Sequence, residues 1–188
     1  MSYSTDPRAA RSREAMLVAA LRLLADEGLE AITHHRVAQQ AGVGRATVYR
    51  HWPRTEQLLL DVMSGSELPL FAEPEAPVRA WLRRHLRQMA DELAIPAVAA
   101  VSLTLMQSAL SDPEVARRQD ASLDTIADRL NAAIRLAVAN GELETGAGPS
   151  DVPALLVGPL VYHTTMRRGV VSDDFIDRLI GTVGTWHG

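Results

Sequence analysis

Residues Thr33 to His51 read THHRVAQQAGVGRATVYRH. Small and apolar residues recur in this stretch at helical spacing, and the spacing is interrupted once, at Gly42. Ala38 offers a small side chain where two helices cross, Gly42 tolerates the positive φ of a tight turn, and Val43 fills the angle between the helices. The stretch therefore predicts two short helices joined by a tight turn, which is the arrangement of a helix-turn-helix.

The second of these helices is too polar to be a core helix, because Val48 is its only large aliphatic residue. In a helix-turn-helix the second helix enters the major groove of DNA. Arg45 has the geometry to bond a guanine edge, and Thr47 can reach a base or a phosphate. Tyr49 and His51 can donate to phosphate oxygens. The alternative for these offsets alone is a helical hairpin with a solvated polar face.

The composition favours an all-α protein. Of the 188 residues, 47% are hydrophobic, 22% are charged and only 4% are aromatic, which excludes a disordered chain. The chain has no cysteine, which excludes disulfides, thiolate metal sites and a thiol nucleophile. Alternating strand patterns are scarce, and we expect about nine helices. Outside the quoted stretch, the punctuation by proline, serine, aspartate and glycine predicts helices over residues 11–27, 77–93, 96–110, 113–140, 151–168 and 173–186.

Charge and composition divide the chain into two domains. Residues 1–60 hold eight arginines and six acidic residues, whereas residues 61–188 hold eleven arginines and seventeen acidic residues. Residues 64–77 contain three prolines, two serines and a glycine, which is typical of a connector. We therefore expect a three-helix helix-turn-helix DNA-binding domain over 1–63 and a larger helical domain over 64–188.

Three other patterns have structural explanations. Adjacent His34 and His35 point about 100° apart on a helix, so they predict no metal site. The aspartates from Asp173 to Asp177 resemble a diphosphate–metal motif, but acids after Ser172 favour a helix N-terminus. The uncharged stretch 93–111 contains proline and polar residues and predicts a buried helix, not a membrane span. We expect no metal, no cofactor and no enzymatic activity.

Several of these residues also match a known family in order and spacing. Gly28 ends the first helix, Thr33 caps the second, and Ala-Gly-Val forms the turn over 41–43. Thr-Val-Tyr-Arg-His-Trp then follows over 47–52. With these motifs, the stretch from about Arg11 to Met63 resembles the DNA-binding domain of the TetR/AcrR family of bacterial transcriptional regulators.

The resemblance implies a set of DNA contacts. The start of the second helix and the third helix would meet DNA through Thr33, His34, His35, Arg45, Ala46, Thr47, Tyr49 and His51. The family usually has a phosphate-gripping lysine at the start of the fourth helix, where this chain has Thr55 preceded by Arg54. Either Arg54, through its charge, or Thr55, through the helix N-terminus that it caps, would replace that lysine.

The resemblance also implies a pocket for a small-molecule effector among the middle helices of the second domain. Methionine with a few polar groups would suit a hydrophobic ligand, although the same spacing is typical of plain core. The expected lining residues are Trp81, His85, Met89, Met106, Tyr162, His163 and Met166.

The last two helices have apolar faces wider than packing on one side requires, and this excess predicts a homodimer through both helices, as in the family. A two-fold pair of helix-turn-helices reads half-sites about 34–36 Å apart, or multiples of that spacing. One apolar stripe contains Val152, Leu155, Leu156, Pro159, Leu160 and His163, and the other contains Phe175, Ile176, Leu179, Ile180 and Val183.

Together these features predict a cytoplasmic, homodimeric repressor that binds double-stranded DNA at a pseudo-palindromic operator and is released by a small molecule. The sequence leaves activation open as well as repression. The alternative is a helical small-molecule-binding or protein-interaction module that does not bind DNA. A steep dependence of DNA affinity on salt would separate the two.

Overall fold

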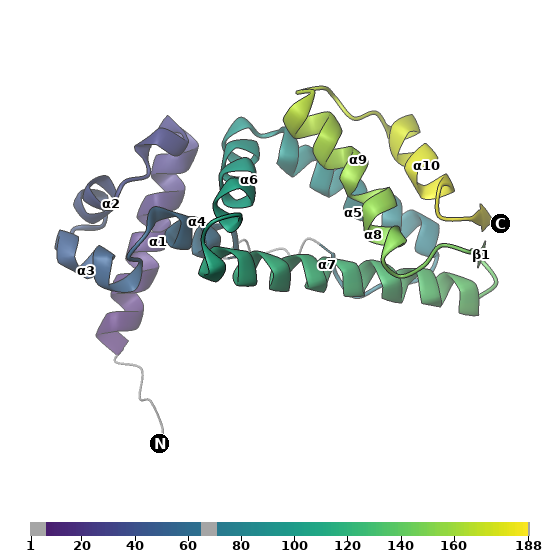
Figure 1. Cartoon of the computed structure of the whole chain (residues 1–188), viewed down its shortest axis with the longest axis horizontal. Coiled ribbons are helices and arrows are strands. Elements are labelled where there is room, and N and C mark those ends of the chain that lie inside the picture. Colours follow the sequence, from purple (N-terminus) through teal and green to yellow (C-terminus); the bar gives the residue numbers. More distant parts are fainter. Residues whose placement is uncertain (1–6, 65–70, 188) are drawn as a thin grey trace, which may run out of the picture. The chain divides into compact units, whose positions relative to one another are not determined.

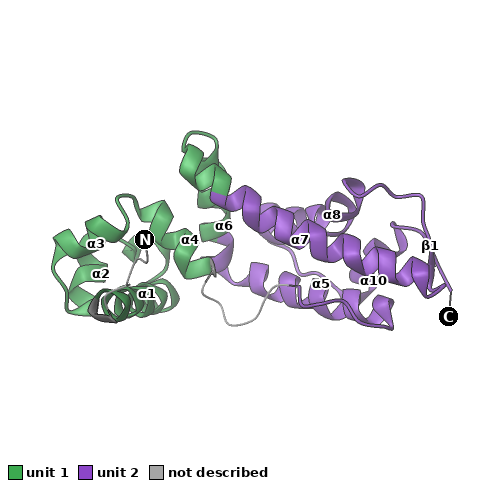
Figure 2. Ribbon diagram, turned by 90° about the horizontal axis from the view of Figure 1, so that it is seen from below, with its two compact units in different colours: residues 1–66, 100–117 green, residues 67–99, 118–188 purple. Residues whose placement is uncertain are grey.

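The computed structural model describes residues 7–64 and 71–187. They form two compact units, coloured separately in Figure 2. The first unit contains residues 1–66 and also 100–117, and the second contains 67–99 and 118–188. Besides the N-terminal residues, the first unit therefore includes most of the helix Pro96–Ala109 and the start of the helix Pro113–Ala139. Of the predicted connector, residues 65–70 lie outside the described residues.

The N-terminal part of the first unit is a small helical domain (Figure 1). Its helices are α1 (Pro7–Glu27), α2 (His34–Ala41), α3 (Arg45–His51) and α4 (Thr55–Ser64), with a short turn of 3₁₀ helix at Leu29–Ala31. α1 packs on both α2 and α4, and α2 packs on α3. The core takes apolar residues from every helix and includes Met16, Ala20, Leu23, Val37, Ala38, Val48, Trp52, Leu58 and Leu59.

The remaining elements follow in chain order. They are α5 (Val78–Ala94), α6 (Pro96–Ala109), α7 (Pro113–Ala139), β1 (Leu143–Glu144), α8 (Asp151–Leu156), α9 (Gly158–Val161), a π-helical segment (Tyr162–Met166), α10 (Asp173–Gly181) and β2 (Thr185–Trp186). The core of the second unit is built mainly from Trp81, Leu82, Leu86, Leu130, Leu156, Leu160, Ile176 and Ile180. The all-α prediction is confirmed, with one small departure.

That departure is a two-residue antiparallel pair, in which Leu143 lies opposite Trp186 and Glu144 opposite Thr185. The helix predicted over 173–186 consequently ends at Gly181. Gly184 has φ +153° and lies so close to β1 that a Cβ atom would be 2.2 Å from the Glu144 carbonyl oxygen. Only glycine fits at this approach of two backbones.

The helix predicted over 151–168 is also interrupted. Pro159 has no N–H to donate to the carbonyl of Leu155, and α8 gives way to α9 at this point. The segment then widens into π-helix, whose extra residue per turn shifts the side chains that follow. The apolar pattern correctly predicted helical structure here. It did not predict the break, because the break depends on backbone hydrogen bonding, which the pattern of apolar side chains does not reveal.

The two apolar stripes that predicted a dimer are mostly used inside the chain. Val152, Leu156 and Leu160 on the first stripe are buried, and so are Ile176, Leu179, Ile180 and Val183 on the second. The stripes are wide because these helices also pack against α5. Most of both stripes is therefore buried within one chain, and dimerisation through these helices stays a prediction.

The aspartates at the start of α10 have structural partners. Ser172 caps the helix, since its side chain accepts from the Phe175 N–H at 3.2 Å. Arg83 pairs with Asp177 at 3.1 Å. Among the described residues, no group of three or more histidines and carboxylates is placed to hold a metal ion. Within the same residues, no single helix is long and apolar enough to cross a membrane. Only α5 and α6 taken together have that length and apolarity, and the two helices are bent at Ile95.

Candidate nucleic-acid interface

The turn between α2 and α3 has the geometry that its residues predict. Thr33 caps α2, with its Oγ1 accepting from the Arg36 N–H at 3.2 Å. Gly42 ends α2 in the left-handed conformation, at φ 66°. The next N–H, of Val43, then donates to the Ala38 carbonyl at 3.0 Å, which closes the turn. Gly44 leads into α3 with extended backbone.

His34 fastens the two helices together. It is the first residue of α2, it is only 9% exposed, and its Nε2–H donates to the Trp52 carbonyl at the end of α3 over 2.6 Å. Its ring also lies flat against the ring of Tyr49, with centroids 4.0 Å apart and planes 3° apart. The Tyr49 ring on α3 is therefore supported by a stacked imidazole from α2.

The outer face of Tyr49 lies next to Arg45. The two residues are one turn apart on α3, and the Arg45 Nη2 donates to the Tyr49 hydroxyl at 3.2 Å. The guanidinium lies 5.4 Å from the centre of the ring. Tyr49 is 40% exposed and Arg45 is exposed, so a phenol and a cation are held together at the surface of α3.

Trp52 is the anchor beneath this arrangement. It is 2% exposed, and its Nε1–H donates to Asp61 on α4 at 2.6 Å. Arg13 on α1 pairs with the same carboxylate at 2.5 Å, and its guanidinium lies 5.6 Å from the Trp52 ring centre. This ion pair fixes the end of α3 to two other helices. The sequence match included Trp52 but gave it no role.

The predicted DNA-contacting residues divide by exposure. Thr33, His35, Arg45, Ala46, Tyr49 and Arg54 are exposed, and Thr47, His51 and Thr55 are half-buried. His34 departs from the expectation, because both its ring face and its Nε2 are engaged inside the protein. Its position at N1 of α2 directs the ring under Tyr49, whereas the ring of the next residue is exposed.

His51 also differs from the phosphate donor that the sequence predicts. Its Nε2 is enclosed, with no hydrogen-bond partner among the described residues. Burial lowers the pKa of His51, and the positive charges of Arg50 and Arg13 lower it further. The ring is therefore predominantly neutral at neutral pH, and it packs at the end of α3 next to the Trp52 ring.

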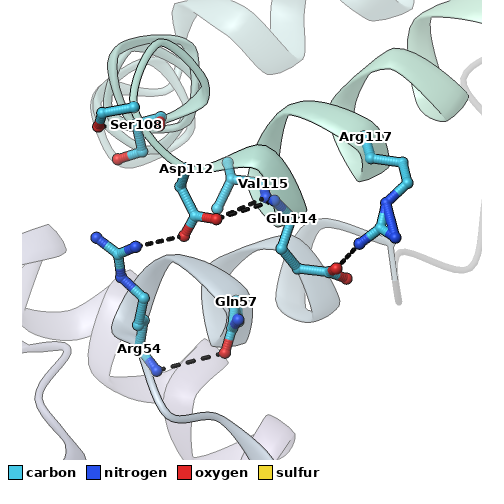
Figure 3. A network of polar contacts seen from close by, with 8 residues as sticks. Arg54, Gln57, Ser108, Asp112, Glu114, Val115 and Arg117 are labelled. Carbon is cyan, nitrogen blue, oxygen red and sulfur yellow. Dashed lines mark hydrogen bonds and ion pairs between the residues drawn. The ribbon is translucent and has the colours of Figure 1, made fainter.

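Two arginines near the interface are held by acidic residues of the same unit. Arg36 makes a bidentate ion pair with Glu27, with N–O distances of 2.5 and 2.8 Å. These hydrogen bonds hold the pKa of the Glu27 carboxyl below its usual value. Arg54 pairs with Asp112 at 2.7 Å (Figure 3). The sequence shows both cations but not their partners, because the second pair joins residues 58 positions apart.

The structure does not gather the predicted effector-contacting residues into one cavity. Trp81 and Met89 are core residues, and His85 stacks on Trp81 and bonds its carbonyl. Tyr162 and Met166 are 52% and 63% exposed. His163 packs against Phe175, and Met106 belongs to the other compact unit. The helical spacing of these residues thus reflects core packing and surface more than a ligand site.

Two hollows are present in the second unit. One, of about 450 Å³, is lined by residues of the α8 and β2 region, including Ala154, Leu155 and Val183. The other, of about 860 Å³, is lined by Arg79, Arg83, Glu142, Trp186 and neighbouring residues. None of the predicted effector-contacting residues lines either hollow.

Two family models match most of the chain. The model of bacterial regulatory proteins of the tetR family matches residues 16–62, which contain the helix-turn-helix. The model of the tetracyclin repressor-like C-terminal domain matches residues 74–183.

Curated relatives agree with these matches. An uncharacterized HTH-type transcriptional regulator of Mycobacterium tuberculosis is 25% identical over 169 residues, covering 86% of this chain and 84% of the relative. The HTH-type transcriptional repressor LfrR of Mycolicibacterium smegmatis is 34% identical over 129 residues, covering 65% of each chain.

Solved structures share the fold. The TetR family transcription regulator SCO0332 has a TM-score of 0.72 at 23% identity, covering 92% of this chain and 96% of that one. A complex of SmeT with triclosan has a TM-score of 0.64 at 19% identity, covering 93% and 92%. A regulator from Saccharomonospora viridis in complex with choline has a TM-score of 0.63 at 20% identity, covering 92% and 95%.

The stacking of His34 on Tyr49 gives a stability prediction. The substitution His34→Ala removes a stacked ring pair and leaves the Trp52 carbonyl without its donor. We expect the free energy of unfolding in urea to fall by about 2–3 kcal/mol. The exposed neighbour provides the control, since His35→Ala should change it by less than about 0.5 kcal/mol. Equal losses in the two variants would contradict the role given to His34.

The enclosed ring of His51 gives a pH prediction. Its pKa is lower in the folded protein than in the unfolded chain, so the unfolded chain binds more protons between those two values. The stability contributed by the neutral ring is therefore complete above the ordinary histidine pKa of about 6.5 and is lost as the pH falls toward the folded value.

The test compares urea unfolding of the parent and of His51→Gln, which cannot take up the proton. The stability advantage of the parent over the variant should shrink between pH about 7.5 and about 5.5. An advantage that stays constant or grows on acidification would show that the folded protein does not disfavour protonation of His51.

Proposed function

The chain belongs to the TetR family of bacterial transcriptional regulators, and we propose that it is a ligand-responsive repressor that binds a pseudo-palindromic operator as a homodimer. It is a DNA-binding helix-turn-helix protein, as its family is. The observation that carries the proposal is the surface of α3, where Arg45 and Tyr49 are exposed and are already held in place by each other and by His34.

The proposed contact surface is smaller than the sequence indicates. The exposed residues of the α2 start and of α3, together with half-buried Thr47 and Thr55, supply it: Thr33, His35, Arg45, Ala46, Thr47, Tyr49 and Thr55. Arg45 is the residue suited to a guanine edge, and the hydroxyls of Thr33, Thr47 and Tyr49 are suited to phosphate. His34 and His51 act from beneath by fixing the position of α3.

Dimerisation is proposed through exposed residues of α8, α9 and the π-helical segment, with small residues at the α8–α9 break. Ala154, Gly158, Tyr162 and Met166 follow at intervals of four residues, and all four are exposed. Nothing lies within 4 Å of the position that a Cβ atom on Gly158 would take, so a partner helix can approach closely here. This face is distinct from the buried stripes of the same helices.

The effector is proposed to be a small hydrophobic molecule that releases the repressor from DNA in the bacterial cytoplasm. The fold neighbours solved with triclosan and with choline support a small-molecule ligand for this chain. For release to occur, the effector must bind more tightly to the form that does not fit the operator, and a coupling of about 1–3 kcal/mol would be typical. We assign no lining residues to its site.

DNA binding is tested by a salt titration on the duplexes that the protein retains from fragmented genomic DNA. Binding should weaken steeply, by at least about tenfold, between about 50 and 200 mM salt, because counterions are released from the phosphates that the protein contacts. A flat response would instead support a module that binds small molecules or proteins. In the same assay Tyr49→Phe should weaken binding about tenfold, since it removes one phosphate donor and the hydroxyl that accepts from Arg45.

Two features make Tyr49→Phe a clean variant. The ring remains, so its stack on His34 and the fold are retained. The control is Ser122→Ala, which removes a hydroxyl from an exposed residue of α7 in the second unit, away from both the proposed DNA contacts and the proposed dimer face. If both variants bind the retained duplex as the parent does, the Tyr49 hydroxyl has no part in recognition.

The dimer is tested by sedimentation equilibrium of Gly158→Glu. The Gly158 site has room for a side chain within one protomer, so the fold should be unaffected. In the dimer the substitution would bring two carboxylates into the proposed interface. We expect the parent to sediment at twice the chain mass of 20.4 kDa and Gly158→Glu at the chain mass. Ala121→Glu, on an exposed site of α7, should remain dimeric. A dimeric Gly158→Glu would place the interface elsewhere.

A further inference from the structure

Arg54 has a partner inside the first unit that occupies its guanidinium. It lies just before α4, and its Nη1 donates to the Asp112 Oδ2 at 2.7 Å (Figure 3). The Arg54 side chain is 54% exposed, whereas the Asp112 side chain is 7% exposed. The pair therefore joins a cation that water can reach to a carboxylate that water scarcely reaches.

The other oxygen of Asp112 is also occupied. Its Oδ1 accepts from the backbone N–H groups of Glu114 at 2.9 Å and Val115 at 3.4 Å, which caps the start of α7. The Asp112 N–H donates in turn to the Ser108 carbonyl on α6 at 2.9 Å. The carboxylate is thus fixed between two helices and cannot follow Arg54 if that side chain moves away.

A buried carboxylate that loses its cation is strongly disfavoured, whereas a half-exposed arginine that loses its anion is readily solvated. Separating the ion pair therefore costs more free energy at Asp112 than at Arg54. DNA phosphate, the competing anion for Arg54, must displace a partner that is already desolvated and in hydrogen-bonding contact. The ion pair opposes any use of this arginine as a phosphate contact.

We propose that Asp112 withholds Arg54 from the DNA backbone, so that Arg54 is a reserve phosphate contact and Asp112 is the residue that limits affinity for duplex DNA. The proposal rests on the proposed DNA binding, in which Arg54 follows the recognition helix α3 by three residues. It also resolves the sequence ambiguity between Arg54 and Thr55, because the charge of Arg54 is already committed in the free protein.

The test measures binding to a mixed-sequence duplex long enough for two half-sites, as a function of salt. Asn accepts the same two N–H groups but carries no charge, so Asp112→Asn retains the α7 cap and releases Arg54. We expect tighter binding, with a plot of log affinity against log salt steeper by about 0.9 for each Arg54 released. The double variant Arg54→Gln/Asp112→Asn should return to the slope of the parent, and Arg54→Gln alone should leave that slope unchanged.

Glu114→Gln is the matched control. It removes one negative charge two residues away, from an exposed side chain that pairs with Arg117, and it leaves Arg54 bound to Asp112 (Figure 3). Circular dichroism establishes that each variant is folded, and Asp112→Ser, which also caps a helix, replaces Asp112→Asn if the latter is not.

The outcomes separate the two proposals. A parent protein whose duplex binding does not depend on salt overturns the proposed function itself. A salt-dependent parent with equal slopes for Asp112→Asn and Glu114→Gln overturns only the withholding of Arg54, and so does a shallower slope for Arg54→Gln alone, which would mean that Arg54 already contacts phosphate.

Discussion

The hydrogen bond from His34 to the Trp52 carbonyl determines how the recognition helix is presented. It joins the first residue of α2 to the residue that ends α3, and the same imidazole supports the ring of Tyr49. The crossing of the two helices and the position of an exposed phenol are therefore set by one buried side chain. Because Trp52 is in turn held by Asp61, the whole recognition surface depends on groups that face inward.

Several positive charges near these helices are neutralised inside the unit. Arg13, Arg36 and Arg54 each pair with a carboxylate of the same unit. Arg45 instead lies on a neutral phenol that leaves its charge uncompensated. Three of the arginines in this unit are thus neutralised within it, whereas Arg45 on α3 is not paired with a carboxylate in the described residues.

The sequence predicted the helix-turn-helix because every requirement of that motif is local. Gly42 needs only its own φ, and Thr33 needs only an N–H three residues ahead. The direction in which His34 points is different, since it depends on where Trp52 and Tyr49 lie after folding. The burial of the expected effector-contacting residues has a related reason. Helical spacing states that Trp81 and Met89 share a face, but only packing decides that this face is core.

Asp112 illustrates the limit of sequence reasoning most clearly. In the sequence it is one acid in a turn between two helices, far from Arg54. In the structure its two oxygens serve a helix cap and a cation at once, and burial makes that combination costly to separate. The cation just before α4, Arg54, is therefore neutralised by a carboxylate of the same unit. Under the proposed function, the phosphate contact can therefore be adjusted without changing any residue of α3, through an acid that is distant from it in sequence.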